Sequence, residues 1–206
     1  EFRRVLFRSR LAPCSIIATP KGETVLDFGQ NLSGWVEFRV RGAAGERVVL
    51  RHFEVLDAEG NVYLANLRTA KQCIDYTLRG EGEECYHPHF TFQGFRYVLI
   101  ERWPGTPTRD DFVAVVLHSA MTPTGHIETS NADLNQLHHN IMWGLKGNFV
   151  DIPTDCPQRD ERLGWTGDAQ IFCRTASYLM QTRTFFAKWL TDLQHDQTPE
   201  GGVPHV

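Results

Sequence analysis

Residues 151–168 concentrate side chains that can transfer protons and bind hydroxyl groups. The segment reads DIPTDCPQRDERLGWTGD and holds five carboxylates, two arginines, two prolines, two glycines and one tryptophan. The prolines and glycines favour non-helical backbone, so a specified loop is expected rather than a solvated run of charges. Crowded carboxylates raise one another's pKa, which keeps one protonated as a general acid. An acid beside hydroxyl-binding carboxylates is what glycosidic bond cleavage requires.

The same loop also supplies a platform for a sugar ring. Trp165 offers a flat apolar face, and the Asp and Arg side chains can hydrogen-bond to several hydroxyls. A purely structural interpretation stays open on composition alone. In that case Asp160, Glu161 and Arg162 form surface ion pairs, Asp168 caps the following helix, and Trp165 is a core residue.

Residues 24–119, upstream of this loop, have the pattern of β-structure. Short runs of β-branched, aromatic and aliphatic residues show partial two-residue alternation, as in Trp35–Val40. Turn-forming stretches separate the runs, at residues 29–31, 42–45, 57–61 and 80–82. We therefore predict an antiparallel β-sandwich that occupies residues 13–121 and has Phe112–Leu117 as its last strand.

The pattern becomes helical after residue 121. Ser130 is expected to cap a first helix, whose apolar residues recur at three- and four-residue intervals as far as Leu145. Two further helices are expected, from near Gly167 to Met180 and from Thr184 to His195. The apolar side of the third helix holds Phe185, Phe186, Trp189, Leu190 and Leu193. We expect apolar faces such as Phe185/Trp189 to lack partners, because few helices are present to cover them.

The two ends of the chain look unnatural. The chain opens with EFRRVLFRS, which lacks an initiator Met and whose apolar run is too short for a signal peptide. We expect residues 1–12 to be a non-native leader. The other end stops in a Gly/Pro loop directly after a helix, so we expect the chain to be a fragment of a longer protein.

Residues 155–168, DCPQRDERLGWTGD, resemble the signature loop of glycoside hydrolase family 78, the inverting α-L-rhamnosidases. Residues 26–35 and 90–97 also resemble segments of that family's sandwich domain. In the family, a β-sandwich directly precedes an (α/α)6 barrel of six helical hairpins. The resemblance thus implies a multidomain fold, β then α, in which residues 122–206 are the N-terminal part of the six-hairpin catalytic domain.

The resemblance also implies a role for each site residue. Glu161 is similar to the family's general acid, and the adjacent Asp160 is its nearest rival. The other matching residues are similar to those that bind the substrate, with Asp155, Arg159 and Asp168 at the rhamnose hydroxyls and Trp165 as an aromatic wall. The family's general base is a Glu of a later barrel helix, beyond Val206. We therefore expect this chain alone to have no appreciable rhamnosidase activity.

Composition excludes several other classes of function. The formal net charge of −4 and the lack of a basic stripe argue against nucleic acid, and no apolar run is long enough for a membrane span. The five cysteines form no CxxC pair and no HExxH motif is present, so we expect no metal and no organic cofactor. Unpaired cysteines and the lack of a visible signal peptide favour a cytoplasmic location. The oligomeric state is left open.

Two alternative functions stay open beside a rhamnosidase acting on rhamnosylated oligosaccharides, polysaccharides or plant glycosides. The first is a helical-barrel glycosidase that uses the same acid on another sugar. The second is a carbohydrate-binding sandwich without catalysis, for which the candidate platform is Trp35, Trp103 and the cluster of Phe90, Phe92 and Phe95.

Overall fold

The computed structural model describes residues 6–206, and these divide into two compact units. The sandwich unit consists of residues 8–117 together with residues 157–160. Of the described residues, the helical unit contains 6–7, 118–156 and 161–206. Each unit has a hydrophobic cluster of its own. The short stretch 157–160, from the middle of the candidate loop, therefore belongs with the β-strands rather than with the helices.

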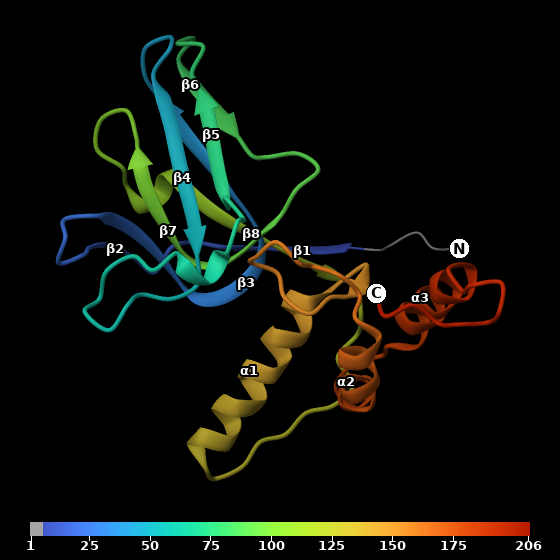
Figure 1. Cartoon of the computed structure of the whole chain (residues 1–206). Coiled ribbons are helices and arrows are strands. Elements are labelled where there is room, and N and C mark those ends of the chain that lie inside the picture. The colour runs from blue at the N-terminus through green and yellow to red at the C-terminus, as the bar shows by residue number, and fades with distance from the viewer. Residues whose placement is uncertain (1–5) are drawn as a thin grey trace. The chain divides into compact units, whose positions relative to one another are not determined.

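The sandwich unit is built on antiparallel strands, which confirms the predicted class (Figure 1). The main path of the sheet runs β1-β8-β3-β7-β4-β5, with β2 and β6 paired to β3. The strands are β1 (Leu6–Leu11), β2 (Ser15–Ala18), β3 (Thr24–Arg41), β4 (Arg47–Phe53), β5 (Cys73–Thr77), β6 (Glu83–Tyr86), β7 (Gln93–Arg102) and β8 (Phe112–Ser119). Two 3-10 turns lie between strands, at Ala65–Leu67 and Arg109–Asp111.

Strand β3 pairs with four other strands of the sheet. Its first half pairs with β2 and β7, its second half pairs with β6 and β8, and the register shifts between Asp27 and Leu32. Gly34 lies where the pairing changes partner, opposite both Gln93 and Val116. A Cβ on Gly34 would overlap the carbonyl oxygen of Val115 on the paired strand β8, so only glycine fits at this position.

His52, on β4, is fully buried, and its Nδ1 lies 2.9 Å from the carbonyl oxygen of Gln72. Burial lowers the pKa of His52 to about 4. In the unfolded chain, the pKa of histidine is about 6.5. Between about pH 6.5 and pH 4, the unfolded chain therefore binds a proton at His52 that the folded chain does not bind. The free energy of unfolding should therefore fall by roughly 3 kcal/mol as the pH drops from about 6.5 to about 4.

The variant His52→Leu tests this pH dependence, because leucine cannot titrate. We expect urea unfolding of the variant at pH 7 and at pH 4.5 to lack the part of the slope that His52 contributes. The comparison uses slopes, since the substitution changes the absolute stability as well. Equal slopes in the two proteins would show that His52 is protonated inside the folded sandwich.

The helical unit contains the three helices that the sequence predicts (Figure 1). They are α1 (Ala132–Asn148), α2 (Thr166–Leu179) and α3 (Arg183–His195), and a short hairpin of β9 (Phe149–Val150) and β10 (Ile152–Pro153) follows α1. The predicted cap Ser130 is wrong by one residue. Asn131 caps α1, and its side chain accepts hydrogen bonds from the backbone N–H groups of Asp133 and Leu134.

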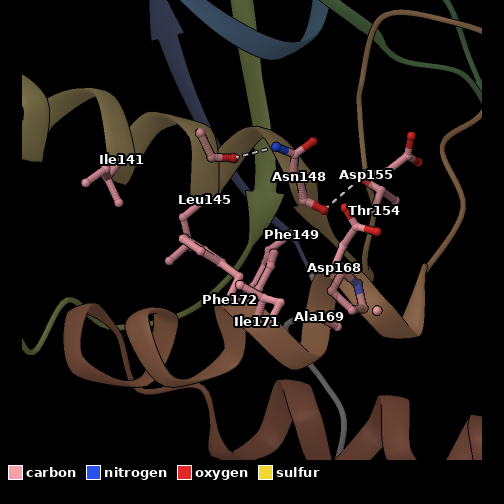
Figure 2. Close-up of a pocket in the computed structure, with 13 residues that line it drawn as sticks. Ile141, Leu145, Asn148, Phe149, Thr154, Asp155, Asp168, Ala169, Ile171 and Phe172 are labelled. Atoms are coloured by element: carbon pink, nitrogen blue, oxygen red, sulfur yellow. Dashed lines mark hydrogen bonds between the residues drawn. The ribbon is translucent and has the colours of Figure 1, made fainter.

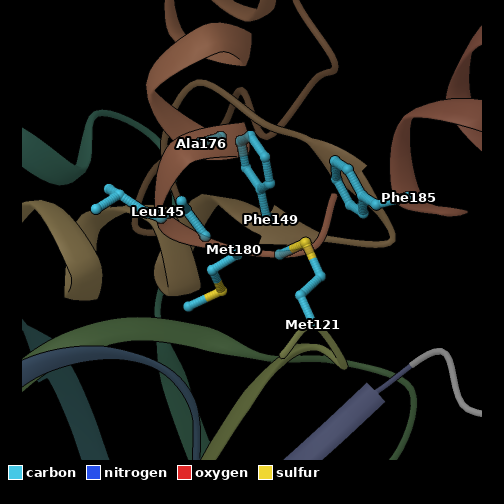
Figure 3. Packing of buried hydrophobic residues seen from close by; sticks show 7 residues of the cluster. Met121, Leu145, Phe149, Ala176, Met180 and Phe185 are labelled. Atoms are coloured by element: carbon cyan, nitrogen blue, oxygen red, sulfur yellow. The ribbon is translucent and has the colours of Figure 1, made fainter. Parts of the chain in front are cut away.

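A hydrophobic cluster joins the three helices (Figure 3). The ring of Phe149 stacks on Phe185 with 4.6 Å between the ring centres. The prediction that Phe185 and Trp189 lack partners is therefore wrong, because both are buried. Other apolar residues of the helices are exposed instead: Leu134, Leu137, Ile171, Tyr178 and Leu190.

Within residues 6–206, no helix combines the length and the apolar character needed to cross a bilayer.

Candidate active site

The loop 155–163 is closed at its base by one residue pair. The backbone N–H of Asp155 donates to the carbonyl oxygen of Leu163, and the N–H of Leu163 donates to Oδ1 of Asp155, both at 3.2 Å. Asp155 thus has a structural role that the sequence did not reveal, since its carboxylate closes the loop. Arg162, just before this closure, has a φ of 55° and is half-buried. The loop is therefore a specified structure and not a solvated charge run.

Residues 157–160 pack within the sandwich unit. A Cβ on Gly94, at the start of β7, would lie 2.8 Å from the backbone N of Gln158 and from two atoms of Pro157. Glycine at position 94 thus permits the backbone of this stretch to lie directly against the strand. Asp160 adds two hydrogen bonds, from the N–H of Thr69 at 3.3 Å and from its hydroxyl at 2.7 Å.

The hydrogen bonds from Thr69 distinguish the environment of Asp160 from that of Glu161. Hydrogen bonding by the Thr69 side chain lowers the pKa of Asp160 below its ordinary value. A general acid must keep its proton near neutral pH, and Asp160 is thus suited to stay ionised. Glu161 belongs to the helical unit, so the two adjacent acids have different environments.

Replacing Asp160 by Asn should therefore have little effect on catalysis. We expect kcat/KM to fall by less than about tenfold, below the roughly 10²–10⁴-fold that a general acid contributes. Steady-state assay of a full-length rhamnosidase that contains this sequence measures the effect, with Thr69→Val as the matched variant on the other side of the contact. A loss of a thousandfold in Asp160→Asn alone would move the acid role to Asp160.

Arg159 also lies in the sandwich unit, where its charge acts on Glu54. Burial raises the pKa of Glu54, while a hydrogen bond from Asn31 and the charge of Arg159 oppose that rise. Glu54 directly follows β4 and is not part of a recognisable sequence motif, so the sequence did not indicate it as a neighbour of Arg159. The guanidinium of Arg159 thus has an acidic neighbour on the sandwich.

Glu161 lies in the helical unit, close to Asp155 and Cys156. One carboxylate oxygen from each acid and the Sγ of Cys156 lie within 4.8 Å of one another. Cys156 is buried, and its sulfur interacts electrostatically with Arg162. Burial lowers the pKa of Arg162, and Cys156 opposes that shift. The structure therefore brings two of the predicted site residues together, Asp155 and Glu161.

A pocket of about 610 Å³ opens beside Asp155, between α1 and α2 (Figure 2). Polar residues gather at one end of the pocket, and Ile141 lies at the other end. The polar lining consists of Asn148, Thr154, Asp155 and Asp168. The volume falls within the range of small-molecule sites. Asp155 and Asp168 thus share one pocket wall, whereas Glu161 is not part of the lining.

Trp165 and Asp168 are positioned by the start of α2. Trp165 is the N-cap residue of the helix, without a side-chain cap, and Asp168 lies in the first turn. A carboxylate there is stabilised by the positive end of the helix dipole. Asp168 is exposed and is not the cap, so the capping role considered from sequence is wrong. The indole Nε1 of Trp165 is buried and meets no acceptor among the described residues.

Two family profiles match consecutive parts of the chain. The bacterial α-L-rhamnosidase concanavalin-like domain matches residues 17–118, and the bacterial α-L-rhamnosidase six-hairpin glycosidase domain matches residues 122–206. The chain belongs to the bacterial α-L-rhamnosidases. The rhamnosidase resemblance drawn from residues 155–168 is thereby confirmed, as is the order of a sandwich and then the six-hairpin domain.

Individual rhamnosidases agree with the profiles over nearly all of the chain. An α-L-rhamnosidase of Streptomyces avermitilis is 49% identical over 195 residues, which are 94% of this chain and 19% of that protein. The solved structure of the S. avermitilis α-L-rhamnosidase complexed with L-rhamnose superposes with a TM-score of 0.94 at 45% identity, over 100% of this chain and 20% of that one. A structure from Dictyoglumus thermophilum gives a TM-score of 0.91 at 40% identity, over 96% of this chain and 22% of that one. The chain thus spans about a fifth of the length of these rhamnosidases.

Proposed function

We propose that this chain carries the general-acid loop of an enzyme that hydrolyses terminal α-L-rhamnosyl linkages with inversion. Glu161 protonates the departing glycosidic oxygen, and the substrates are rhamnosylated oligosaccharides, polysaccharides or plant glycosides. Asp155, Arg159 and Asp168 bind the rhamnose hydroxyls, and Trp165 forms an aromatic wall of the subsite. Hydrolysis itself uses no metal and no organic cofactor.

The observation that carries this proposal is the different environment of two adjacent acids. Asp160 accepts two hydrogen bonds from Thr69 in the sandwich unit, whereas Glu161 lies beside Asp155 in the helical unit. Asp155 in turn lines the pocket that also contains Asp168. Of the two acids, Glu161 is therefore the one that lies beside Asp155 and in the same unit as Asp168.

The base of the reaction is proposed to lie outside this chain. An inverting glycosidase needs about 6.5–9.5 Å between its two carboxyl groups, which leaves room for the attacking water. One carboxylate oxygen of Asp155 lies within 4.8 Å of one of Glu161, whereas the base must face the acid across the attacking water. Asp155 thus suits sugar binding rather than activation of water, and the chain by itself should not turn over rhamnosides.

Hydrolysis of aryl glycosides tests the proposal. A full-length rhamnosidase that contains this sequence should cleave p-nitrophenyl α-L-rhamnoside faster than the matching aryl glycosides of other sugars. NMR of the fresh product should show β-L-rhamnose first, as inversion requires. Robust turnover by residues 1–206 alone, or α-L-rhamnose as the first product, would contradict the assigned base or the inversion.

The structure gives little support to a sugar-binding platform on the sandwich. Trp35 and Phe95 are buried, and Trp103 packs its ring against Phe38 and Phe112. Phe90 is fully exposed, but a single ring offers a small stacking surface. Titration of L-rhamnose into the chain with Phe90 replaced by Ala should therefore give the same binding isotherm as the unchanged chain.

A further inference from the structure

Three potential metal ligands of different chemical hardness converge at the base of the loop. They are the Sγ of Cys156 and one carboxylate oxygen each from Asp155 and Glu161, all within 4.8 Å of one another. Two of them are sequence neighbours, and the third returns to them because the Asp155–Leu163 hydrogen bonds close the loop. Cys156 is only 7% exposed and Oδ2 of Asp155 is buried, whereas Glu161 is partly exposed. A small ion can therefore reach the group from the side of Glu161.

This donor set selects a particular class of metal. Ca²⁺ and Mg²⁺ prefer oxygen ligands alone, whereas Zn²⁺ and Co²⁺ accept a thiolate together with carboxylates. Zinc bond lengths of about 2.3 Å to sulfur and 2.0–2.2 Å to oxygen place tetrahedral donors about 3.5 Å apart. The three atoms need to approach by no more than about 1.3 Å, which side-chain torsions can supply. Three protein ligands leave a fourth position for water.

The local charge also favours a divalent cation. With Cys156 as a thiolate, the three ligands carry three negative charges, and the neighbouring Arg162 carries one positive charge. A divalent ion offsets two of the three ligand charges. The thiolate is the form of cysteine that binds metal. The displaced thiol proton passes to solvent.

We propose that Asp155, Cys156 and Glu161 form an inhibitory site for a borderline transition-metal ion such as Zn²⁺ or Co²⁺. Bound metal coordinates the carboxylates of Glu161 and Asp155. Glu161 then cannot donate a proton to the leaving group. Metal binding is independent of the proposed function, whereas the inhibition rests on it.

Cobalt spectroscopy on residues 1–206 tests the site directly. Titration with Co²⁺ should produce a thiolate-to-cobalt charge-transfer band in the near ultraviolet, and excess Zn²⁺ should abolish it. Cys156→Ser should lose the band and bind Co²⁺ at least tenfold more weakly, while Glu161→Gln should keep the band with weaker affinity. Cys173→Ser is the matched control, since Cys173 is a partly buried thiol of the same unit that lies outside the group, and its band should be unchanged. No band, or a band that survives in Cys156→Ser, would overturn the site.

Inhibition is measured separately in a full-length rhamnosidase that contains this sequence. Zn²⁺ should lower the hydrolysis of an aryl α-L-rhamnoside, a chelator should restore it, and Cys156→Ser should need at least tenfold more Zn²⁺ for the same loss. Equal sensitivity of the unchanged enzyme and Cys156→Ser would overturn the inhibitory role. Absence of any rhamnosidase activity would contradict the proposed function instead, and the cobalt spectra would still decide the metal site.

Discussion

Replacing Glu161 by Gln is expected to lower kcat/KM about 10³-fold for rhamnosides with poor leaving groups. The glutamine amide keeps the size of the side chain but cannot deliver a proton to the glycosidic oxygen. A loss of this size is typical for removal of a general acid and corresponds to about 4 kcal/mol of transition-state stabilisation. The measurement is steady-state hydrolysis by a full-length rhamnosidase that contains this sequence.

The dependence on leaving group distinguishes the loss of an acid from general damage. A dinitrophenyl rhamnoside releases a stable phenolate and needs no proton, so the variant should cleave it within about tenfold of the unchanged enzyme. Asp160→Asn serves as the control, since it removes a neighbouring charge of the same loop. If Glu161→Gln slowed both substrates equally, Glu161 would act in binding or folding rather than as the acid.

The order of elements could be predicted because hydrophobic periodicity reflects burial directly. Alternation in Trp35–Val40 corresponds to β3, and the three helical patterns correspond to α1, α2 and α3. The predicted last strand ended at Leu117, whereas β8 continues to Ser119. Asn131 rather than Ser130 caps α1, because both residue types suit the position and only the backbone path decides between them.

Tertiary contacts within the site could not be predicted from local patterns. Asp160 and Thr69 are 91 residues apart, and neither residue carries a signal for the other. The environment of Arg159 depends in the same way on Glu54, which stands outside any motif. The prediction of unpartnered residues on α3 failed because Phe149, directly after α1, supplies a ring for Phe185. The loop and the types of functional side chain in it could thus be identified from sequence. The different environments of adjacent loop residues depend on long-range packing, which local patterns do not encode.

Replacing Gly94 by Ala is expected to lower kcat/KM about 10²-fold by displacing residues 157–160. Gly94 has no positive φ, so alanine suits its backbone, but the new Cβ would lie 2.8 Å from the backbone of both Pro157 and Gln158. Backbone atoms cannot rotate away as a flexible side chain can, and the stretch that carries Arg159 must therefore move. A misplacement of about 1 Å in a site residue can cost about 10²-fold in rate, and the overpacking should lower the free energy of unfolding by about 1–3 kcal/mol.

A matched glycine separates the effect on the loop from the effect on stability. Gly82 has a φ of 93° and nothing within 4 Å of an added Cβ, so Gly82→Ala strains only its own turn in the sandwich unit. The backbone strain should cost roughly 1 kcal/mol of stability and leave kcat/KM unchanged. Urea unfolding and aryl rhamnoside hydrolysis, measured on both variants, decide the matter. If Gly94→Ala kept full activity, the contact between β7 and residues 157–160 would have no part in positioning Arg159, and the sandwich would stabilise the loop without contributing to catalysis.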